Sequence, residues 1–204
     1  AARPLLMFGF GVVLSLAIYS FAALPLLVSV LGRVSPWRLY PAMAPALLTA
    51  FSSASSSATL PITLDCLQRR AGVSPRIAGF VLPLGTSINH AGSALYECAA
   101  ALFIAQAYGL HLSIATQATV VLLALVTSMG IAGIPAASLV GITVILTAVG
   151  LPAEAIGVLL VLDRLLDMAR TAVNVLADSV CTVIVARLSG DAGALRAVPG
   201  DTPS

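Results

Sequence analysis

Hydrophobic residues run through this chain in long blocks that polar residues interrupt at only a few places. No Asp, Glu, Lys or Arg occurs within residues 4–32, 39–64 or 98–153. About 20 consecutive apolar residues suffice for one helix to cross a bilayer. The pattern therefore predicts an all-α membrane protein in which several helices cross or enter the bilayer.

Two of these apolar blocks are interrupted in the middle by small and polar residues. A run of Ser and Ala at residues 52–58 divides the second block and Pro61 follows it, while residues 130–135 (GIAGIP) divide the third. Backbone that leaves the helix at membrane depth is tolerated only against protein or a water-filled cavity. We therefore expect two re-entrant helical hairpins with an inverted relation, at residues 41–72 and 112–149.

The expected order of segments repeats a hairpin followed by a helix. It comprises a transmembrane helix at 1–32, hairpin one at 41–72, a transmembrane helix at 77–108 that is broken near Asn89, hairpin two at 112–149, a transmembrane helix at 153–188, and a disordered cytoplasmic tail at 189–204. Interrupted apolar segments at matching positions of two halves indicate a binding site near the bilayer midplane, as in secondary transporters.

The last predicted helix carries a stripe of polar side chains. At about 100° per residue, Asp163, Asp167, Arg170, Asn174 and Asp178 fall within an arc of roughly 80°. An ionised side chain at bilayer depth costs at least about 2.5–3.5 kcal/mol. These groups therefore need polar partners, and we expect them to belong to a buried binding site.

Each charged group of the stripe has a functional interpretation and a structural one. The guanidinium of Arg170 matches a ligand carboxylate in a bidentate way, but it could instead pair with Asp167 or Asn174. Asp167 could bind a substrate ammonium group, or Arg164 could neutralise it. Asp178, with backbone carbonyls at a helix break, would suit a hard cation, or it could simply be a polar helix end.

His90 lies in the predicted break of residues 77–108. A histidine there can be a hydrogen-bonded structural residue or a group that titrates during function, and the sequence leaves both possibilities open.

Charge and motifs exclude several classes of function. The chain has a net charge of +2 and only 9% charged residues, which gives no basis for nucleic-acid binding. Neither a Gly-x-Ser-x-Gly elbow nor a His-Glu-x-x-His motif occurs, and the three cysteines have no metal-ligand spacing. We therefore do not expect an enzyme.

The positive-inside rule places the C-terminus in the cytoplasm, together with the loops that contain Arg33, Arg38, Arg69, Arg70 and Arg76.

Four collinear segments resemble a known family. They are residues 55–61 (SSSATLP), 83–89 (PLGTSIN), 128–135 (SMGIAGIP) and 167–175 (DMARTAVNV). The chain resembles the C-terminal half of the dicarboxylate/amino acid:cation symporters, the glutamate transporter family, over about residues 1–190. The resemblance implies an elevator-type transporter of the plasma membrane that is usually a homotrimer.

The resemblance also implies roles for individual residues. Arg170 would bind the side-chain carboxylate of the substrate and Asp167 its amino group. The pocket would be completed by Thr171, Asn174, Ser93 and the backbone at Ser56 and Ile134. One sodium ion would lie between Asp178 and carbonyls of Gly85, Asn89 and Asn174, and a second would use carbonyls at Ser87, Ser128, Met129 and Ile131.

The helix break is where the chain departs from the family pattern. The family usually reads Asn-Met-Asp-Gly-Thr where this chain reads Asn89-His90-Ala91-Gly92-Ser93. The missing Asp normally helps to form a third sodium site, and the missing Met normally links the substrate and sodium sites. Our hypothesis is altered coupling, with fewer sodium ions and a proton carried by His90.

The function expected from the sequence is secondary active symport of an acidic amino acid, glutamate or aspartate, with sodium and/or protons. Because the chain begins at Ala1 inside an apolar run, we expect a C-terminal fragment that lacks the scaffold of the family. A C4-dicarboxylate symporter of the same fold is the nearest alternative. A non-transporting, degenerate membrane fragment is another.

Overall fold

The computed structural model describes residues 2–130, 133–191 and 193–195, and every regular element in these residues is a helix. The elements are α1 (Ala2–Ile18), the π-helical η1 (Tyr19–Ala23), α2 (Leu24–Val30), α3 (Pro36–Ser53), α4 (Ser56–Asp65), the π-helical η2 (Cys66–Arg70), α5 (Pro75–Ile88), α6 (Ala91–Ala107), α7 (Ile114–Met129), α8 (Ser138–Ala148), the 3₁₀-helical η3 (Ala153–Val158) and α9 (Leu160–Leu188). The predicted all-α class is confirmed for this part of the chain.

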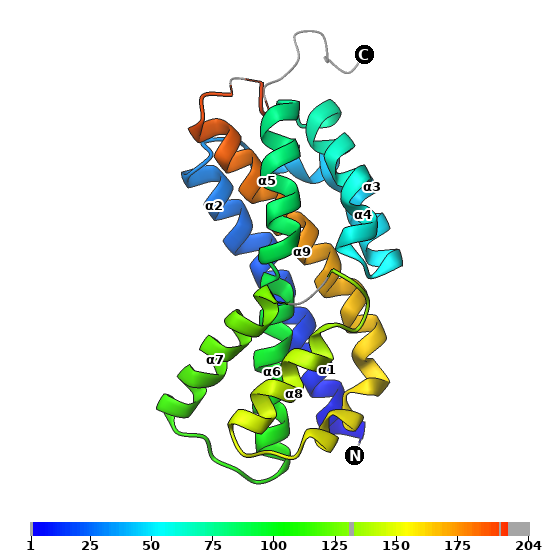
Figure 1. The fold of residues 1–204 in the computed structure, drawn as a ribbon, viewed down its shortest axis with the longest axis vertical. Helices are drawn as coiled ribbons and strands as arrows, with labels where there is room; N and C mark the ends of the chain where they lie inside the picture. Colours follow the sequence, from blue (N-terminus) through cyan, green and yellow to red (C-terminus); the bar gives the residue numbers. More distant parts are fainter. Residues whose placement is uncertain (1, 131–132, 192, 196–204) are drawn as a thin grey trace.

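Helix α9 runs through the centre of the fold, and the other helices pack around its two ends (Figure 1). Around its C-terminal half, α2, α3, η2 and α5 form one hydrophobic core, with Leu39, Met43 and Val183 fully buried. Around its N-terminal half, α1, α6, α7 and α8 form a second core that includes Ile142 and Leu146. The polar stripe of α9 passes from one core to the other.

Among the described residues, two helices are long and apolar enough to span a membrane. They are Arg3–Val30, which joins α1, η1 and α2 over 28 residues, and Leu160–Leu188 with 29 residues. A helix of 20 residues already covers about 30 Å, so both exceed the thickness of a bilayer core. The first is lined on its outer side by exposed apolar residues such as Phe10 and Phe21.

Helices α3 and α4 form the first predicted hairpin. Helix α3 ends at Ser53, Ala54 adopts a left-handed conformation with φ 52°, and the hydroxyl of Ser55 accepts a hydrogen bond from the Ala58 N–H to cap α4. The first arm begins at Pro36 and not at residue 41, and is 18 residues long. Proline is favoured in the first turn of a helix, so the helix begins at Pro36, in a segment that the sequence indicated as a loop.

The predicted interruption of the third helix is also present. Helix α5 ends at Ile88, Asn89 and His90 have non-helical backbone angles, and α6 begins at Ala91. The second predicted hairpin consists of α7 and α8, which contact each other (Figure 1). Residues 153–158 form a separate 3₁₀ helix before α9, an arrangement that is frequent at the N-termini of α-helices. The α-helix therefore begins at Leu160 and not at residue 153 as predicted.

The first residues of the predicted tail are ordered, which corrects the expectation of disorder for them. Ala194 and Leu195 are buried in the core around the C-terminal half of α9, and the Leu195 N–H donates to the Ala71 carbonyl at 2.6 Å. The polar composition of the tail did not indicate that these two apolar side chains would pack against the end of α9. Residues 196–204 lie outside the described part of the chain.

Candidate functional site

The tips of the two hairpins touch each other. The hydroxyl of Ser55 donates to the carbonyl of Gly133 at 2.7 Å, and the Ser57 N–H donates to the same carbonyl at 3.3 Å. A Cβ atom built on Gly133 would lie 2.6 Å from the Ser57 hydroxyl. Only glycine at this position permits so close an approach between the tips.

The second tip is also bound to α9. The backbone N–H of Ala136 donates to Oδ2 of Asp167 at 2.8 Å. Ala136 adopts a left-handed backbone conformation with φ 62°, which is uncommon for a residue other than glycine. The carboxylate of Asp167 therefore holds a strained turn against the middle of the central helix.

Arg170 lies at the centre of a buried ionic network. Its side chain is 1% exposed, and Nη2 lies 2.9 Å from Oδ1 of Asp167. Nη1 lies 3.3 Å from Oδ1 of Asp163. The guanidinium carbon is 4.1 Å from the ring centroid of Tyr96, a cation–π distance, and the Tyr96 hydroxyl donates to Asp163 at 2.9 Å. The internal ion pair with Asp167, one of the two interpretations from sequence, is therefore present.

Tyr96 and Asp163 are also parts of this network; the sequence placed Asp163 on the polar stripe but gave it no individual role, and it did not indicate Tyr96. Asp163 is seven residues before Arg170, so the two side chains lie on the same face of α9 two turns apart, a spacing that could have indicated the pair. No sequence signal placed Tyr96 on the guanidinium, because Tyr96 belongs to a different helix.

Asn174 connects α9 to the start of α6. Its Oδ1 accepts from the Gly92 N–H at 2.8 Å, and its Nδ2 donates to the Ser93 hydroxyl at 3.1 Å. A Cβ atom on Gly92 would lie 2.8 Å from the Arg170 carbonyl. The helix break thus allows a backbone N–H in the first turn of α6, that of Gly92, to bind the polar stripe of α9.

Most of the predicted substrate residues line one cavity between the hairpin tips, α6 and α9. The cavity has a volume of about 20 Å³, roughly the space that one water molecule needs. Its lining includes Ser56, Ser93, Ile134, Asp167, Thr171 and Asn174, together with His90. Arg170 is not among the lining residues. An amino acid can enter this site only if the hairpin tips separate.

Asp178 lies further along α9 and is 2% exposed. Asn89 donates to its Oδ1 at 3.0 Å and the Thr86 hydroxyl donates to its Oδ2 at 3.4 Å. No ion pair of Asp178 occurs among the described residues. A Cβ atom on Gly85 would lie 3.1 Å from Oδ1. A buried carboxylate beside the open backbone of a helix break fits a hard cation such as sodium, which prefers oxygen ligands.

The second predicted cation set uses backbone carbonyls on α5 and α7, two helices that contact each other. Ser128 is buried and its hydroxyl donates to the Leu125 carbonyl at 3.0 Å. Ser87 is exposed, and Met129 is 53% exposed. Ile131 lies outside the described residues. Within the part of the chain that the structure describes, no three His, Cys, Asp or Glu side chains form a metal-binding group.

Glu97 joins α6 to both arms of the second hairpin. It is completely buried, and its Oε2 accepts a hydrogen bond of 2.6 Å from the Thr127 hydroxyl on α7. A Cβ atom on Gly141 of α8 would lie 2.7 Å from the Glu97 carboxylate. Glu97 therefore faces the neighbouring helices α7 and α8.

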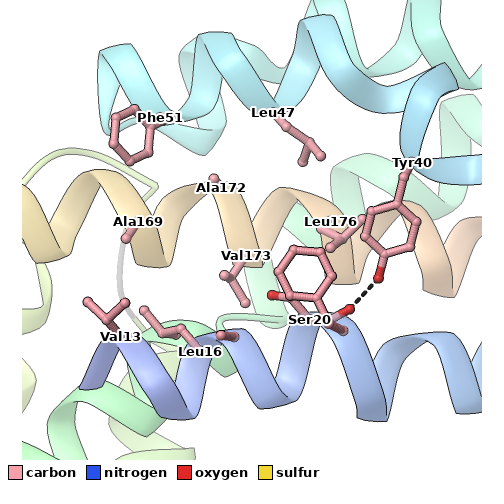
Figure 2. A pocket seen from close by; sticks show the side chains of 12 residues that line it. Val13, Leu16, Ser20, Tyr40, Leu47, Phe51, Ala169, Ala172, Val173 and Leu176 are labelled. Carbon is pink, nitrogen blue, oxygen red and sulfur yellow. Dashed lines mark hydrogen bonds between the residues drawn. The ribbon is translucent and has the colours of Figure 1, made fainter. Parts of the chain in front are cut away.

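A larger cavity of about 390 Å³ lies between the α1–η1 helix, α3 and α9 (Figure 2). Val13, Leu16, Leu47, Phe51, Val173 and Leu176 point into it, and the Tyr40 hydroxyl donates to the Ser20 carbonyl at one end. The lining carries no charged side chain. This cavity therefore does not suit an acidic substrate, whereas the cavity between the hairpin tips is lined by polar residues of α9 and is the candidate site.

Comparison with known proteins agrees with this arrangement. The sequence pattern of the Sodium:dicarboxylate symporter family matches residues 1–188. The chain belongs to this family. The resemblance found in the sequence is thereby confirmed.

Members of the family with considerable sequence identity come from animals. The chain is 50% identical to mouse excitatory amino acid transporter 3 over 174 residues, which is 85% of this chain and 33% of that protein. It is 45% identical to the putative sodium-dependent excitatory amino acid transporter glt-4 of Caenorhabditis elegans over 180 residues, 88% of this chain and 36% of the other. It is 44% identical to human excitatory amino acid transporter 1 over 185 residues, 91% and 34%. The chain spans about a third of the length of these relatives.

Proposed function

We propose that this chain forms the substrate- and ion-binding part of a secondary active symporter for an acidic amino acid, glutamate or aspartate. The observation that carries the proposal is the buried network of Asp163, Asp167 and Arg170 on α9, with Asp167 bound to the second of two hairpin tips that touch each other. Ionised groups are expensive at bilayer depth and are usually functional there. The names of the family and of its animal members support the same substrate class.

The charges of the network favour an amino acid over a plain dicarboxylate. Two carboxylates and one guanidinium carry a formal charge of −2 + 1 = −1, so a ligand with a cationic group is better compensated than one with two negative charges alone. In this proposal Arg170 binds the side-chain carboxylate and Asp167 the ammonium group. The remaining contacts come from Thr171, Asn174, Ser93 and the backbone at Ser56 and Ile134.

Substrate entry requires the contacts between the tips to break. The ammonium group would replace the Ala136 N–H on Asp167, and the Ser55–Gly133 hydrogen bond would be lost. The second hairpin would move, because the ammonium group would take the place of its Ala136 N–H on Asp167. It would therefore act as the gate.

Sodium is the coupling ion in this proposal, and Asp178 is its anchor, with carbonyls of Gly85, Asn89 and Asn174 as further ligands. Ser87, Ser128, Met129 and Ile131 would form a second site. Ala91 removes a carboxylate that the family pattern usually has, so we propose fewer sodium ions, with a proton on His90 as a further coupling ion.

Uptake into sealed vesicles tests the coupling. With altered coupling, uptake of labelled aspartate should depend on both sodium and pH, and His90→Gln should remove the pH dependence alone. Full sodium dependence without any effect of pH, unchanged in His90→Gln, would exclude a proton on His90.

Assembly and topology form part of the same proposal. The hairpins are re-entrant, the C-terminus is cytoplasmic, and the complete protein is a homotrimer of the plasma membrane that moves its substrate by an elevator mechanism. Chemical cross-linking of the protein made from its complete coding sequence tests the trimer. Protease accessibility of a C-terminal tag in intact cells tests the orientation.

A C4-dicarboxylate symporter of the same fold is the alternative substrate assignment. Competition between succinate and labelled aspartate separates the two, because Asp167 should bind a ligand with an ammonium group more tightly than one without it. Succinate that displaces labelled aspartate at equal affinity would favour the dicarboxylate. A protein that folds and binds neither ligand would favour a non-transporting, degenerate member, for which the loss of a carboxylate at Ala91 is the supporting feature.

A further inference from the structure

His90 is a buried histidine whose hydrogen-bonding atoms have no partner. The residue is 4% exposed, and neither Nδ1 nor Nε2 makes a hydrogen bond within the described part of the chain. Oε1 of Glu97 is the other buried side-chain atom there without a partner. More than about nine in ten buried polar groups are hydrogen-bonded, so an imidazole with two unused nitrogens needs an explanation.

The position of His90 supplies one. It precedes α6 in the helix break and lines the polar cavity together with Ser56, Ser93 and Thr171. Other strong hydrogen-bonding groups of that cavity are already engaged: both polar atoms of Asn174 bind the start of α6, and both oxygens of Asp167 accept hydrogen bonds. His90 therefore carries, beside the cavity, a donor and an acceptor that the described part of the fold does not use.

We propose that His90 is a substrate ligand, and that its ring N–H donates a hydrogen bond to the α-carboxylate of the acidic amino acid. This inference rests on the proposed function, in which Arg170 takes the side-chain carboxylate and leaves the α-carboxylate for the other side of the cavity. The tip of the first hairpin, with Ser56, lines the same cavity as His90. A neutral imidazole provides the donor without adding a buried charge.

The proposed contact makes His90 a specificity-determining residue. A hydrogen bond from the imidazole to a carboxylate is charge-assisted and about twice as strong as one to a neutral amide. His90 should therefore favour an α-amino acid over its α-amide. A thioether, as at the corresponding position of the family pattern, has no donor and could not make this distinction.

Ligand binding to variants of His90 tests the assignment. Affinities of L-aspartate and of its α-amide are measured by displacement of labelled aspartate from the protein made from its complete coding sequence. The measurements use saturating sodium at a pH of about 8, where an unperturbed imidazole is neutral. His90→Met removes the donor at similar size, and His90→Gln keeps a donor and an acceptor. His90→Leu is a second donor-free variant.

The expected result is a change in discrimination and not only in affinity. His90→Met and His90→Leu should weaken aspartate binding by about tenfold and reduce the preference for aspartate over its α-amide by about threefold or more. His90→Gln should keep both within about threefold of the unmodified protein.

Two results would overturn the assignment in different ways. If the donor-free variants weaken both ligands equally, or leave aspartate binding intact, His90 is a structural residue and the proposed function still stands. If the unmodified protein binds neither aspartate nor its α-amide in sodium, while the folded protein is present, the proposed function is contradicted and the ligand role of His90 is contradicted with it.

Discussion

Asp163 and Arg170 form a buried ion pair along one face of α9, with Oδ1 of Asp163 3.3 Å from Nη1 of Arg170. Asp167 binds the same guanidinium at 2.9 Å, and Tyr96 both stacks on it and donates to Asp163. The arginine is thus held by two carboxylates and an aromatic ring. A substrate carboxylate must displace or join these groups, so the network both stabilises the fold and sets the cost of binding.

Asp163→Asn and Tyr96→Phe should each destabilise the protein. Breaking a buried ion pair by removing one partner costs about 3–5 kcal/mol; because Asp167 still compensates Arg170, we expect a smaller loss for Asp163→Asn, about 1–3 kcal/mol. Tyr96→Phe should cost about 1.5–3 kcal/mol because it removes a hydrogen bond to a charged group. Thermal denaturation in detergent measures both. Because the two groups share one contact, the double variant should lose less than the sum, and strict additivity would contradict the shared network.

Arg170→Lys should reduce the affinity for aspartate by about tenfold to a hundredfold. Lysine keeps the charge but loses the planar fork that pairs with a carboxylate, and a hydrogen bond to a charged group is worth about 1.5–3 kcal/mol. The matched control is Arg164→Lys, since Arg164 is an exposed arginine on the same helix and should bind aspartate normally. Equal effects of the two substitutions would argue against a ligand role for Arg170.

Gly133→Ala should disturb the contact between the hairpin tips. The new methyl group would lie 2.6 Å from the Ser57 hydroxyl and 3.2 Å from the Ser57 backbone nitrogen, so the tips must move apart. We expect faster exchange of bound aspartate, measured as a larger dissociation rate. Gly130→Ala is the control, because its methyl group would lie 3.6 Å from the nearest atom, the Thr127 carbonyl oxygen, and the dissociation rate should then be unchanged.

Asp178→Asn should weaken sodium binding and thereby raise the sodium concentration that aspartate binding requires. The buried carboxylate is the charged group of the proposed cation site, and an uncharged amide of equal size cannot compensate a cation. Titration of aspartate binding with sodium should show a half-saturating concentration raised by about tenfold or more. Asp65→Asn, at an exposed aspartate that pairs with Arg69, should titrate like the unmodified protein, and identical sodium titrations for Asp178→Asn would exclude this site.

Asp191 should contribute stability that depends on pH. Outside the membrane-spanning helices, the Ser74 N–H at 2.8 Å and further hydrogen bonds lower the pKa of the Asp191 carboxyl. A carboxyl whose pKa is depressed in the folded state stabilises the fold above its unfolded pKa of about 3.9 and loses this effect as pH falls through the folded value. Asp191→Asn should therefore melt at a lower temperature than the unmodified protein at pH about 6, and the difference should shrink below about pH 4. A difference that persists undiminished at low pH would contradict this role.

The order of the helices and the break at Asn89 were predictable because they follow from apolar length and from local interruptions. The start of the first hairpin arm was not, because Pro36 nucleates a helix through residues whose polarity indicated a loop. The ordered turn at Ala194 was missed for a related reason: its stability comes from burial against the end of α9, a tertiary contact that local composition does not encode.

The polar stripe of α9 was also visible in the sequence, since residues three and four apart share a helix face. Its partners on other helices were harder to find. The Ala136 N–H on Asp167 and the Tyr96 ring on Arg170 depend on how the hairpin and α6 pack. The absence of hydrogen bonds at His90 within the described residues could be recognised only after these contacts were placed.

Sodium-driven uptake of labelled L-aspartate tests the central proposal most directly. The protein is made from its complete coding sequence and reconstituted in sealed vesicles with and without an inward sodium gradient. At aspartate concentrations well below half-saturation, the account predicts accumulation that requires the gradient, falls by about tenfold or more in Arg170→Lys and is retained in Arg164→Lys. Uptake that is equal with and without sodium at constant pH, or that is undiminished in Arg170→Lys at these concentrations, would contradict it.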